Sequence, residues 1–444
     1  DPILGRVGND VVFNDELMPA LSAQGIRLIT FNERDKAQHK WVKQYFDQNV
    51  RPLLTPVSLD PSHPFPQVAN KSLNFIVRLS GKDAFGREND IAIVKVPRSL
   101  PRVIRLPLQG NDKTIYMVTL SSVIRAHLKD LFPDRVVGEF SQFRVTRDSE
   151  LLVDEEDAKN LRTALRHGLE HRQFGKPVRL EVSSDCSEHL SQFLLQQFKF
   201  PAEAIYRVDG PVNLVRLTQL IDLVNQPALL FPEFQASYPK QLRENESIFK
   251  QIRKNDVLIH QPFESFKGVL AFLKEAVNDP KVLAIKQTIY RTGTDSELMD
   301  LLREAVVRGK EVTAVVEIKA RFDEEANINW AERLESVGAQ VVYGVVGLKT
   351  HAKMLLVTRR EGSKLMRYGH LSTGNYNART AKLYTDISYL TANPEMTADM
   401  DAVFTQLASQ TRISKLNHLW LAPFHLQEQL MDMVDKVSKA SMHG

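Results

Sequence analysis

Three apolar runs decide the fold of this chain: VLAIKQTIY (282–290), EVTAVVEI (311–318) and QVVYGV (340–345). Each has the β-branched composition of a buried strand. The two segments between them repeat apolar residues at helical spacing, the first at Leu298, Leu301, Leu302, Ala305 and Val306, the second at Trp330, Leu334 and Val337. Strands that alternate with helices form right-handed β-α-β units, so the sequence predicts a sheet that is at least partly parallel.

Local signals predict where these two helices begin and end. Thr294 and Glu297 have the spacing of a capping box, and Gly309 suits the end of the first helix. Asp323 is the expected N-cap of the second helix, which Gly338 ends.

The preceding part of the chain has a different pattern. A helix is expected within residues 40–60, and prolines end it. The short runs NFIVRL, IAIVKV, RVIRL and IYMVTL, between residues 73 and 120, predict an antiparallel sheet. Helices at 121–132, 156–171 and 187–198, with a strand at 177–182, complete an α+β domain. The next segment, residues 225–262, is interrupted by Pro227, Pro232, Pro239 and Pro262 and is therefore predicted to connect two domains.

Composition excludes several classes of protein. With 43% hydrophobic and 25% charged residues the chain is typical of globular domains, and no apolar run reaches the ~18 residues of a membrane span. The first ten residues lack a signal-peptide pattern, so a cytoplasmic protein is expected. A single cysteine, Cys186, excludes an internal disulfide. A net charge of +4 is too small to indicate a nucleic-acid partner, and none is expected.

The carboxyl ends of the three strands carry the first candidate site residues. The first strand runs into Arg291, the second into Arg321 and the third into GLKTHAK, which contains His351. Ligands of open α/β sheets bind at this edge, and guanidinium groups suit phosphate oxygens. An equally good interpretation is that the two arginines pair with nearby carboxylates, namely Asp295, Asp323, Glu324 or Glu325.

His351 and Lys353 are two residues apart and precede the apolar run MLLV. If the strand includes both, their side chains project from one face. A neutral imidazole can attack phosphorus while an ammonium group attracts phosphoryl oxygens, so the pair could relay a phosphoryl group. The spacing alone is weak evidence, because His127 and Lys129 share it within a predicted helix.

The segment STGNYN (372–377) and the LYTD that ends at residue 386 supply three further candidates. Asn375 and Asn377 could orient an imidazole or bind phosphate, and Tyr384 could stack on a base. Taken alone, each residue is better explained by an ordinary turn at Gly374 and Asn375 and by a half-buried strand position for Tyr384. Six basic residues in the α+β domain either hold a long polyanion or are merely solvated: Lys95, Arg98, Arg102, Arg105, Arg144 and Arg147.

Five stretches resemble the polyphosphate kinase family, which has a phospholipase D-like fold. They are IYRTGTDS, VEIKARFDEEANINWAERL, GLKTHAKM, YGHLSTGNYNARTAKLYTD and GEFSQFRVTRDSEL. The resemblance implies reversible transfer of the terminal phosphate of ATP to inorganic polyphosphate, through a phosphohistidine at His351. It also implies that Arg291 and Arg321 lie at the Mg²⁺ and phosphate subsite, and that Tyr384 contacts ATP. Implied partners are ATP or ADP, polyphosphate, a second copy of the chain and a membrane surface.

With the resemblance, the chain divides into five parts. Residues 1–59 are expected to end an N-terminal helical domain, 60–224 to form the α+β middle or head domain, and 225–262 to connect. Residues 263–425 are expected to form a phospholipase D-like α/β catalytic domain with a mixed sheet, and 426–444 a C-terminal helix. Family members have a further C-terminal domain with a second catalytic histidine, so this chain alone is expected to turn over poorly.

Two other functions fit the same residues. A phospholipase D-like phosphodiesterase or nuclease would use His351 on a phosphodiester, although such sites have an aspartate five residues after the lysine, where this chain has Thr358. A polyphosphate-binding fragment without catalysis would need only the basic surface.

Overall fold

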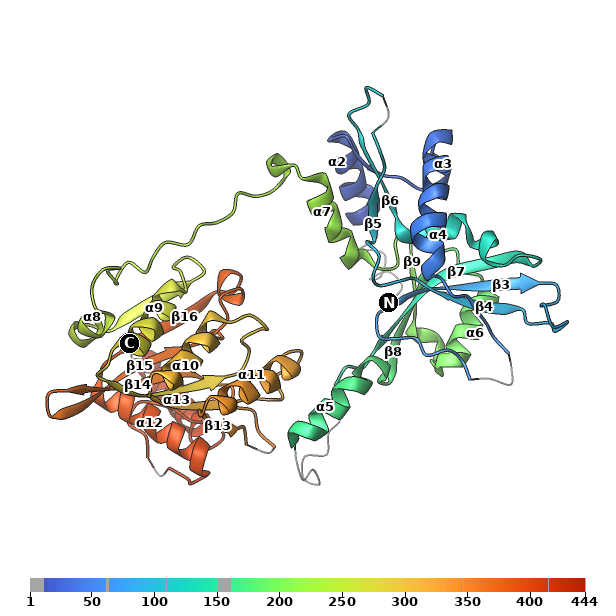
Figure 1. The fold of residues 1–444 in the computed structure, drawn as a ribbon. Helices are drawn as coiled ribbons and strands as arrows, with labels where there is room; N and C mark the ends of the chain where they lie inside the picture. The colour runs from blue at the N-terminus through green and yellow to red at the C-terminus, as the bar shows by residue number, and fades with distance from the viewer. Residues whose placement is uncertain are drawn as a thin grey trace. The chain divides into compact units, whose positions relative to one another are not determined.

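The computed structural model describes residues 12–60, 64–108, 110–150, 161–345, 347–413 and 415–443. The chain forms two compact units (Figure 1). The first contains Asp1–Leu151 and Leu169–Pro232, and the second contains Leu152–Gly168 and Glu233–Gly444. Helix α5 (Leu161–His171) crosses the boundary at Gly168. Of the predicted helix 156–171, residues 156–160 lie outside the described residues.

A six-stranded sheet organises the first unit, in the order β2-β4-β3-β7-β8-β9. Side chains alternate between its faces, so Phe75 and Ile76, neighbours in β3, enter two different apolar cores. Helix α6 (Glu188–Phe198) covers one face, with Leu190 and Leu194 packed beside Ile76. Helices α3 (Lys36–Tyr45) and α4 (Leu120–Ala126) cover the other face. The strands are β2 (Val57–Ser58), β3 (Leu73–Ser80), β4 (Ile91–Lys95), β7 (Val136–Arg147), β8 (Pro177–Ser183) and β9 (Ile205–Val208).

A second, three-stranded sheet has the order β1-β6-β5, formed by Ile26–Leu28, Ile115–Thr119 and Val103–Arg105. The single antiparallel sheet predicted for residues 73–120 is therefore wrong: the runs belong to two sheets, and β1 pairs with β6 in parallel. Pro97 and Pro101 stand between β4 and β5. Proline has no N–H for the ladder, so the chain leaves the first sheet there.

The helices of the first unit are short. They are η2 (Val12–Leu17), α2 (Met18–Ala23), η3 (Phe31–Glu33), α3 (Lys36–Tyr45), η4 (Phe46–Val50), η5 (Arg51–Leu53), α4 (Leu120–Ala126), η6 (Leu128–Leu131), η7 (Arg172–Phe174), α6 (Glu188–Phe198), η8 (Ala202–Ala204), η9 (Leu214–Thr218), α7 (Gln219–Val224) and η10 (Pro227–Leu229).

The second unit has a seven-stranded mixed sheet in the order β10-β16-β15-β14-β11-β12-β13. Strands β11, β12 and β13 are parallel, as predicted, and the others pair antiparallel. The strands are β10 (Val257–Gln261), β11 (Val282–Ile289), β12 (Glu311–Val316), β13 (Gln340–Tyr343), β14 (Lys353–Glu361), β15 (Lys364–Ser372) and β16 (Asp386–Thr391). Strand β10 and helix α8 lie in the predicted connecting segment 225–262, and the structure includes both in this unit.

Helices lie on both faces of this sheet. Helix α12 packs against β14 and β15 so closely that a Cβ on Gly369 would lie 2.5 Å from Met400 Sδ. On the opposite face, Phe249 of α8 contacts Phe272 of α9 and Tyr368 of β15. The helices are α8 (Ile248–Lys254), α9 (Lys267–Asn278), α10 (Glu297–Val307), α11 (Glu324–Ser336), η11 (Thr380–Lys382), α12 (Pro394–Ser409) and α13 (Leu426–His443).

Two predicted caps differ in the structure. Helix α10 has Ser296 as its N-cap, whose hydroxyl accepts from Met299 N, so the predicted box of Thr294 and Glu297 is wrong. Asp323 is the N-cap of α11, but its carboxylate does not cap the helix. Gly309 and Gly338 both have positive φ, as helix ends often require.

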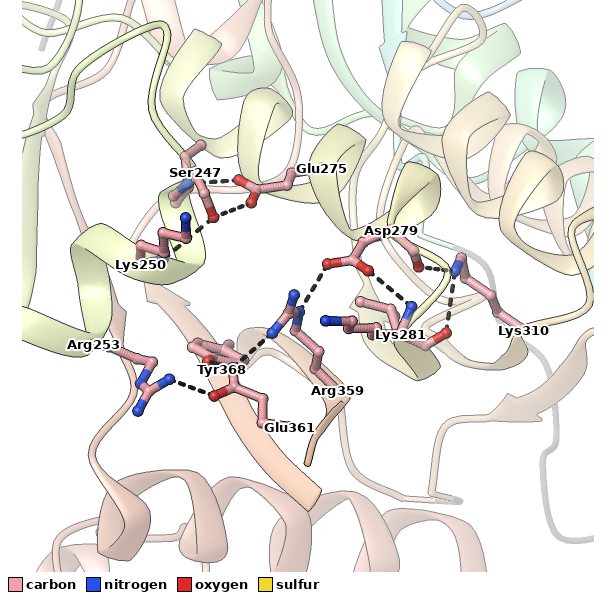
Figure 2. A network of polar contacts seen from close by, with 12 residues as sticks. Ser247, Lys250, Arg253, Glu275, Asp279, Lys281, Lys310, Arg359, Glu361 and Tyr368 are labelled. Carbon is pink, nitrogen blue, oxygen red and sulfur yellow. Dashed lines mark hydrogen bonds and ion pairs between the residues drawn. The ribbon is translucent and has the colours of Figure 1, made fainter. Parts of the chain in front are cut away.

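A polar network fixes the start of β11 and the end of β14 (Figure 2). Asp279 pairs with Arg359 Nε at 2.8 Å, and Arg359 Nη1 lies 2.8 Å from Glu361 Oε1. Glu361 also accepts from the hydroxyl of Tyr368 and from Arg253. The loops that carry the candidate site lie at the opposite end of these two strands.

None of the helices in the described part of the chain has the length and apolar character that a membrane span requires.

Candidate active site

The pairing of β11 with β14 brings the candidate residues to one edge of the sheet. The two strands are antiparallel, with Gln287 opposite Leu355, so the start of β14 lies beside the end of β11. Thr288 locks this position: its hydroxyl donates to Ala352 O at 2.7 Å and accepts from Met354 N at 2.9 Å. His351 and Lys353 flank Ala352, and Tyr290 follows Ile289 at the end of β11.

Tyr290 joins the histidine to the lysine. Its ring meets the His351 ring edge to face, with centroids 4.7 Å apart, and lies 4.8 Å from Lys353 Nζ. Lys353 Nζ also donates to His351 O at 2.5 Å. The strand begins at Lys353, so His351 stands just outside it; the imidazole is exposed while Lys353 is buried. The two side chains meet through the tyrosine ring.

The electrostatic setting favours a neutral imidazole. Partial burial lowers the pKa of His351, and the charges of Lys353, Lys349 and Arg291 lower it further. Burial lowers the pKa of Lys353 to about 8, against an opposing effect of Asp386. At neutral pH His351 therefore has an unprotonated ring nitrogen, while most Lys353 side chains keep their charge.

Arg291 is held by the loop that follows β12. Its Nε lies 2.8 Å from Asp323 Oδ2, and its Nη2 donates to Arg321 O at 2.8 Å. The carboxylate pairing considered from the sequence is thus present for Arg291. It leaves Nη1 without a hydrogen bond among the described residues. Because Arg291 lowers the pKa of both His351 and Lys353, its charge acts on the same site.

Arg321 is exposed, and its guanidinium lies 5.3 Å from the ring of Phe322. Phe322 has φ +74°, a conformation that non-glycine residues rarely adopt. Such strained residues concentrate in binding loops. The structure therefore brings the backbone of Arg321 to Arg291, while the guanidinium of Arg321 lies beside Phe322.

A buried glutamate, which sequence reasoning missed, ties the surrounding loops together. Glu317 directly follows β12 and is fully buried. Its Oε1 accepts from Lys319 N at 2.9 Å and its Oε2 from Thr350 N at 2.7 Å, next to His351. Asn327 donates to the carbonyls of Tyr290 and Glu317. A charged residue directly after a buried strand is the signal that could have identified Glu317.

The two asparagines of the loop STGNYN (372–377) are less directly involved in the candidate site than the sequence suggested. Asn377 Oδ1 accepts from Arg379 N and Thr380 N, as in an ordinary turn. Asn375 Oδ1 is buried and has no hydrogen-bond partner among the described residues. Tyr384 is 62% exposed and precedes β16, so it is not a half-buried strand residue.

Asp386, the last residue of LYTD, also belongs to the site. It raises the pKa of Lys353, and its Oδ1 accepts from the hydroxyl of Thr373 at 2.9 Å. A Cβ on Gly374 would lie 2.6 Å from Asp386 Oδ2, so the small loop residue lets the carboxylate approach. In the sequence, the position of Asp386 at the end of a polar segment is the signal that could have identified it.

No group of three or more histidine, cysteine or acidic side chains in the described residues could hold a metal ion. The hydrogen-bond donors near His351 are the guanidinium group of Arg291 and the ammonium group of Lys353, which bind phosphate oxygens and repel cations. The residues therefore fit a Mg²⁺ that arrives with nucleotide phosphates, and do not fit a cation held by the protein alone.

Comparisons with known proteins agree with this geometry. The protein-family model described as the polyphosphate kinase middle domain matches residues 37–220. The family model described as polyphosphate kinase C-terminal domain 1 matches residues 247–437. A polyphosphate kinase of Neisseria meningitidis is 48% identical over 98% of this chain and 63% of its own length. One of Burkholderia vietnamiensis is 50% identical over 95% of this chain and 62% of its own length.

Among solved structures, the polyphosphate kinase of Porphyromonas gingivalis matches with a TM-score of 0.81 and 28% identity. The match covers 98% of this chain and 63% of that one. The chain thus spans 62–63% of the length of these relatives. The two matching family models and these relatives show that the chain belongs to the polyphosphate kinase family.

Proposed function

We propose that His351 accepts the terminal phosphoryl group of ATP and passes it to inorganic polyphosphate, and that the reaction is reversible. A bond forms between a ring nitrogen and phosphorus while the bond to the ADP oxygen breaks, and ADP leaves with the electron pair. The terminal oxygen of a polyphosphate chain then attacks phosphorus and the nitrogen leaves. The observation that supports this most is the His351 imidazole that meets the ring of Tyr290 edge to face, with its pKa lowered by burial and by the charges of Lys353, Lys349 and Arg291.

The other residues would act on the transferred phosphate. Lys353 and Arg291 offer positive charge beside the nucleophile, which stabilises charge that develops on the phosphoryl oxygens. Arg321 would bind an adjoining phosphate. Asn375 has a buried oxygen, unpaired among the described residues, that would orient a group in the loop. Asn377 holds that loop, and exposed Tyr384 would contact ATP.

Mg²⁺ would bind with ATP and be positioned by Arg291 and Arg321 through the nucleotide phosphates. Magnesium supplies charge neutralisation and orientation of the phosphates in such reactions. The residues of this chain bind the phosphates and hold the imidazole unprotonated.

We infer the same domain roles as from the sequence: a middle domain, and a phospholipase D-like catalytic domain in the second unit. A histidine and a lysine at the start of a strand within a mixed sheet support the latter. Thr358, where phosphodiesterases of this type have an aspartate, pairs with Ala284 within the sheet. Self-association and binding to a membrane surface are further parts of the proposal.

The test is phosphoprotein formation. The chain is incubated with Mg²⁺ and ATP that is labelled in the γ-phosphate, and the digested protein is analysed by mass spectrometry. We expect an acid-labile phosphate on the peptide with His351, its loss on adding polyphosphate, and none in His351→Gln. The matched control is His127→Gln, which removes the other histidine of an H-x-K sequence. Label on His351→Gln, or cleavage of a phosphodiester without label, would contradict the proposal.

A further inference from the structure

The first unit has a small pocket of its own, lined by residues of that unit alone. It lies among β3, β6, β7 and residues 211–217, and its polar lining includes Arg102, Thr119, Ser121, Gln142 and Arg216. Its cavity volume is about 20 Å³, more than the ~10–15 Å³ that one water needs. The pocket therefore accommodates a small polar group.

Arg102 is the unusual residue in this pocket. The residue is only 8% exposed, and its Nη1 is buried with no hydrogen-bond partner in the described part of the chain. Its main chain is fixed at both ends, since Arg102 N donates to Gln219 Oε1 at 2.7 Å and Arg102 O accepts from Leu120 N at 2.9 Å. A buried guanidinium with an unpaired donor lowers stability, and a bound anion would offset that cost.

Among the described residues, the charged groups that shift the pKa of Arg102 are both positive. Within the described residues no carboxylate forms an ion pair with it, and Arg216 lines the same pocket. Burial lowers the pKa of Arg102, and the positive charges of Arg216 and Arg98 lower it further. Two guanidinium groups that repel each other at one pocket are the arrangement that an oxyanion stabilises.

Neutral groups complete the lining. The hydroxyls of Thr119 and Ser121 are 3.1 Å apart, so one donates to the other and the second proton remains for a ligand. Gln142 Oε1 is buried, has no partner among the residues that the structure describes, and could accept from a protonated oxygen. Hydrogen phosphate has both oxygens that accept and a hydroxyl that donates.

Other arginines of this domain already have protein partners. Arg98 donates to Asn70 O, Arg105 to Leu223 O, and Arg147 to Val68 O and Gly175 O. Arg144 pairs with Glu181. Of the basic residues expected from the sequence to hold a polyanion, Arg102 has the strongest structural reason to bind one.

We propose that Arg102 and Arg216 form a binding site for one phosphoryl group, either free orthophosphate or the end of a phosphate chain. The size of the pocket excludes a nucleoside. The site lies in the first unit and does not depend on phosphoryl transfer at His351.

The test is calorimetric titration of the whole chain with orthophosphate and with tripolyphosphate at constant ionic strength. We expect Arg102→Gln and Arg216→Gln to weaken binding at least roughly tenfold, because each removes charge-assisted hydrogen bonds. Arg105→Gln, which replaces a nearby exposed arginine with a protein partner, should bind both ligands as the unmodified chain does. Arg216 is exposed, so its variant should fold normally even if Arg102→Gln does not, which circular dichroism checks.

The comparison of ligands identifies the source of the phosphoryl group. Equal affinity for the two ligands indicates free phosphate, and tighter binding of tripolyphosphate indicates a chain end. Full affinity in a folded Arg216→Gln overturns the site. A loss of affinity only in Arg291→Gln overturns it as well, and places the anion beside His351 instead.

Discussion

The ring of Tyr290 contacts both members of the proposed phosphoryl relay, 4.7 Å from the His351 ring centroid and 4.8 Å from Lys353 Nζ. The tyrosine ring therefore restricts the orientation of the imidazole through the edge-to-face contact, and it stabilises the ammonium group of Lys353 through a cation–π contact. Since it follows β11 directly, the register of β11 with β14 determines the geometry of the site.

Replacing this ring should impair phosphorylation of His351. In Tyr290→Leu the imidazole loses its edge-to-face contact and Lys353 its cation–π contact, interactions of roughly 0.5–2 kcal/mol each. We expect the rate of phosphoprotein formation to fall about 10- to 100-fold. Tyr290→Phe keeps the ring and should retain most of the rate. Equal rates for the leucine and phenylalanine variants would show that the ring has no positioning role.

The sequence correctly predicted which residues lie at one edge of the sheet, but it did not predict how their side chains contact one another. The alternation of β11, α10, β12, α11 and β13 brought Arg291, Arg321 and His351 to one edge because their strands end there. The part played by Tyr290 depends on β14 pairing antiparallel with β11, and no local pattern specifies that register.

Two carboxylates show the same limit of sequence reasoning. Glu317 acts by accepting from Thr350 N, and Asp386 acts on Lys353 from the end of a distant loop. Both contacts join residues far apart in sequence, and neither follows a periodicity. The division of residues 73–120 between two sheets was missed for a similar reason, since pairing partners such as β1 lie elsewhere in the chain.

The pH dependence of the reaction should follow from the two shifted pKa values. His351 acts when unprotonated, and its pKa is lowered from 6.5, so the acid limb should lie below pH 6.5. Lys353 acts when protonated and has a pKa of about 8, so kcat/KM should fall as the pH rises through 8. Lys353→Arg keeps its charge at all these pH values and should lose the alkaline limb. An unchanged alkaline limb in that variant would assign it to another group.

The ion pair of Arg291 with Asp323 should orient the arginine for phosphate. Arg291→Gln removes charge beside the reacting group and should lower kcat about 100-fold with a smaller change in apparent ATP affinity. Asp323→Asn keeps the arginine but weakens the 2.8 Å contact, so we expect a loss of about tenfold. The matched control is Arg308→Gln, because Arg308 forms an exposed ion pair with Glu304 of α10. If Arg291→Gln alters only thermal stability, the ion pair is purely structural.

The network at the opposite end of β14 should contribute to stability alone. Glu361→Ala leaves the hydroxyl of Tyr368 and one donor of Arg359 without their acceptor, which should lower the free energy of unfolding by about 2 kcal/mol. Glu304→Ala removes an exposed carboxylate paired with Arg308 and should cost about 0.5 kcal/mol. Urea denaturation measures both, and phosphorylation of His351 should be unchanged in each. A reduced phosphorylation rate in a folded Glu361→Ala would contradict this separation.

Gly374 should control the charge of Lys353 through Asp386. An added Cβ would lie 2.6 Å from Asp386 Oδ2, so in Gly374→Ala the carboxylate must move away. Asp386 raises the pKa of Lys353 against the effect of burial. Its displacement should therefore bring that pKa below 8, and the alkaline limb of the kcat/KM profile should shift to lower pH. Asp386→Asn removes the same charge without crowding the loop and should shift the limb in the same direction. Gly138→Ala, where an added Cβ would make only an ordinary contact of 3.6 Å with Arg78 O, controls for the loss of a glycine. Because the sign of the shift follows from Coulomb attraction between a carboxylate and an ammonium group, a shift of the limb to higher pH in Asp386→Asn would exclude Asp386 as a partner of Lys353.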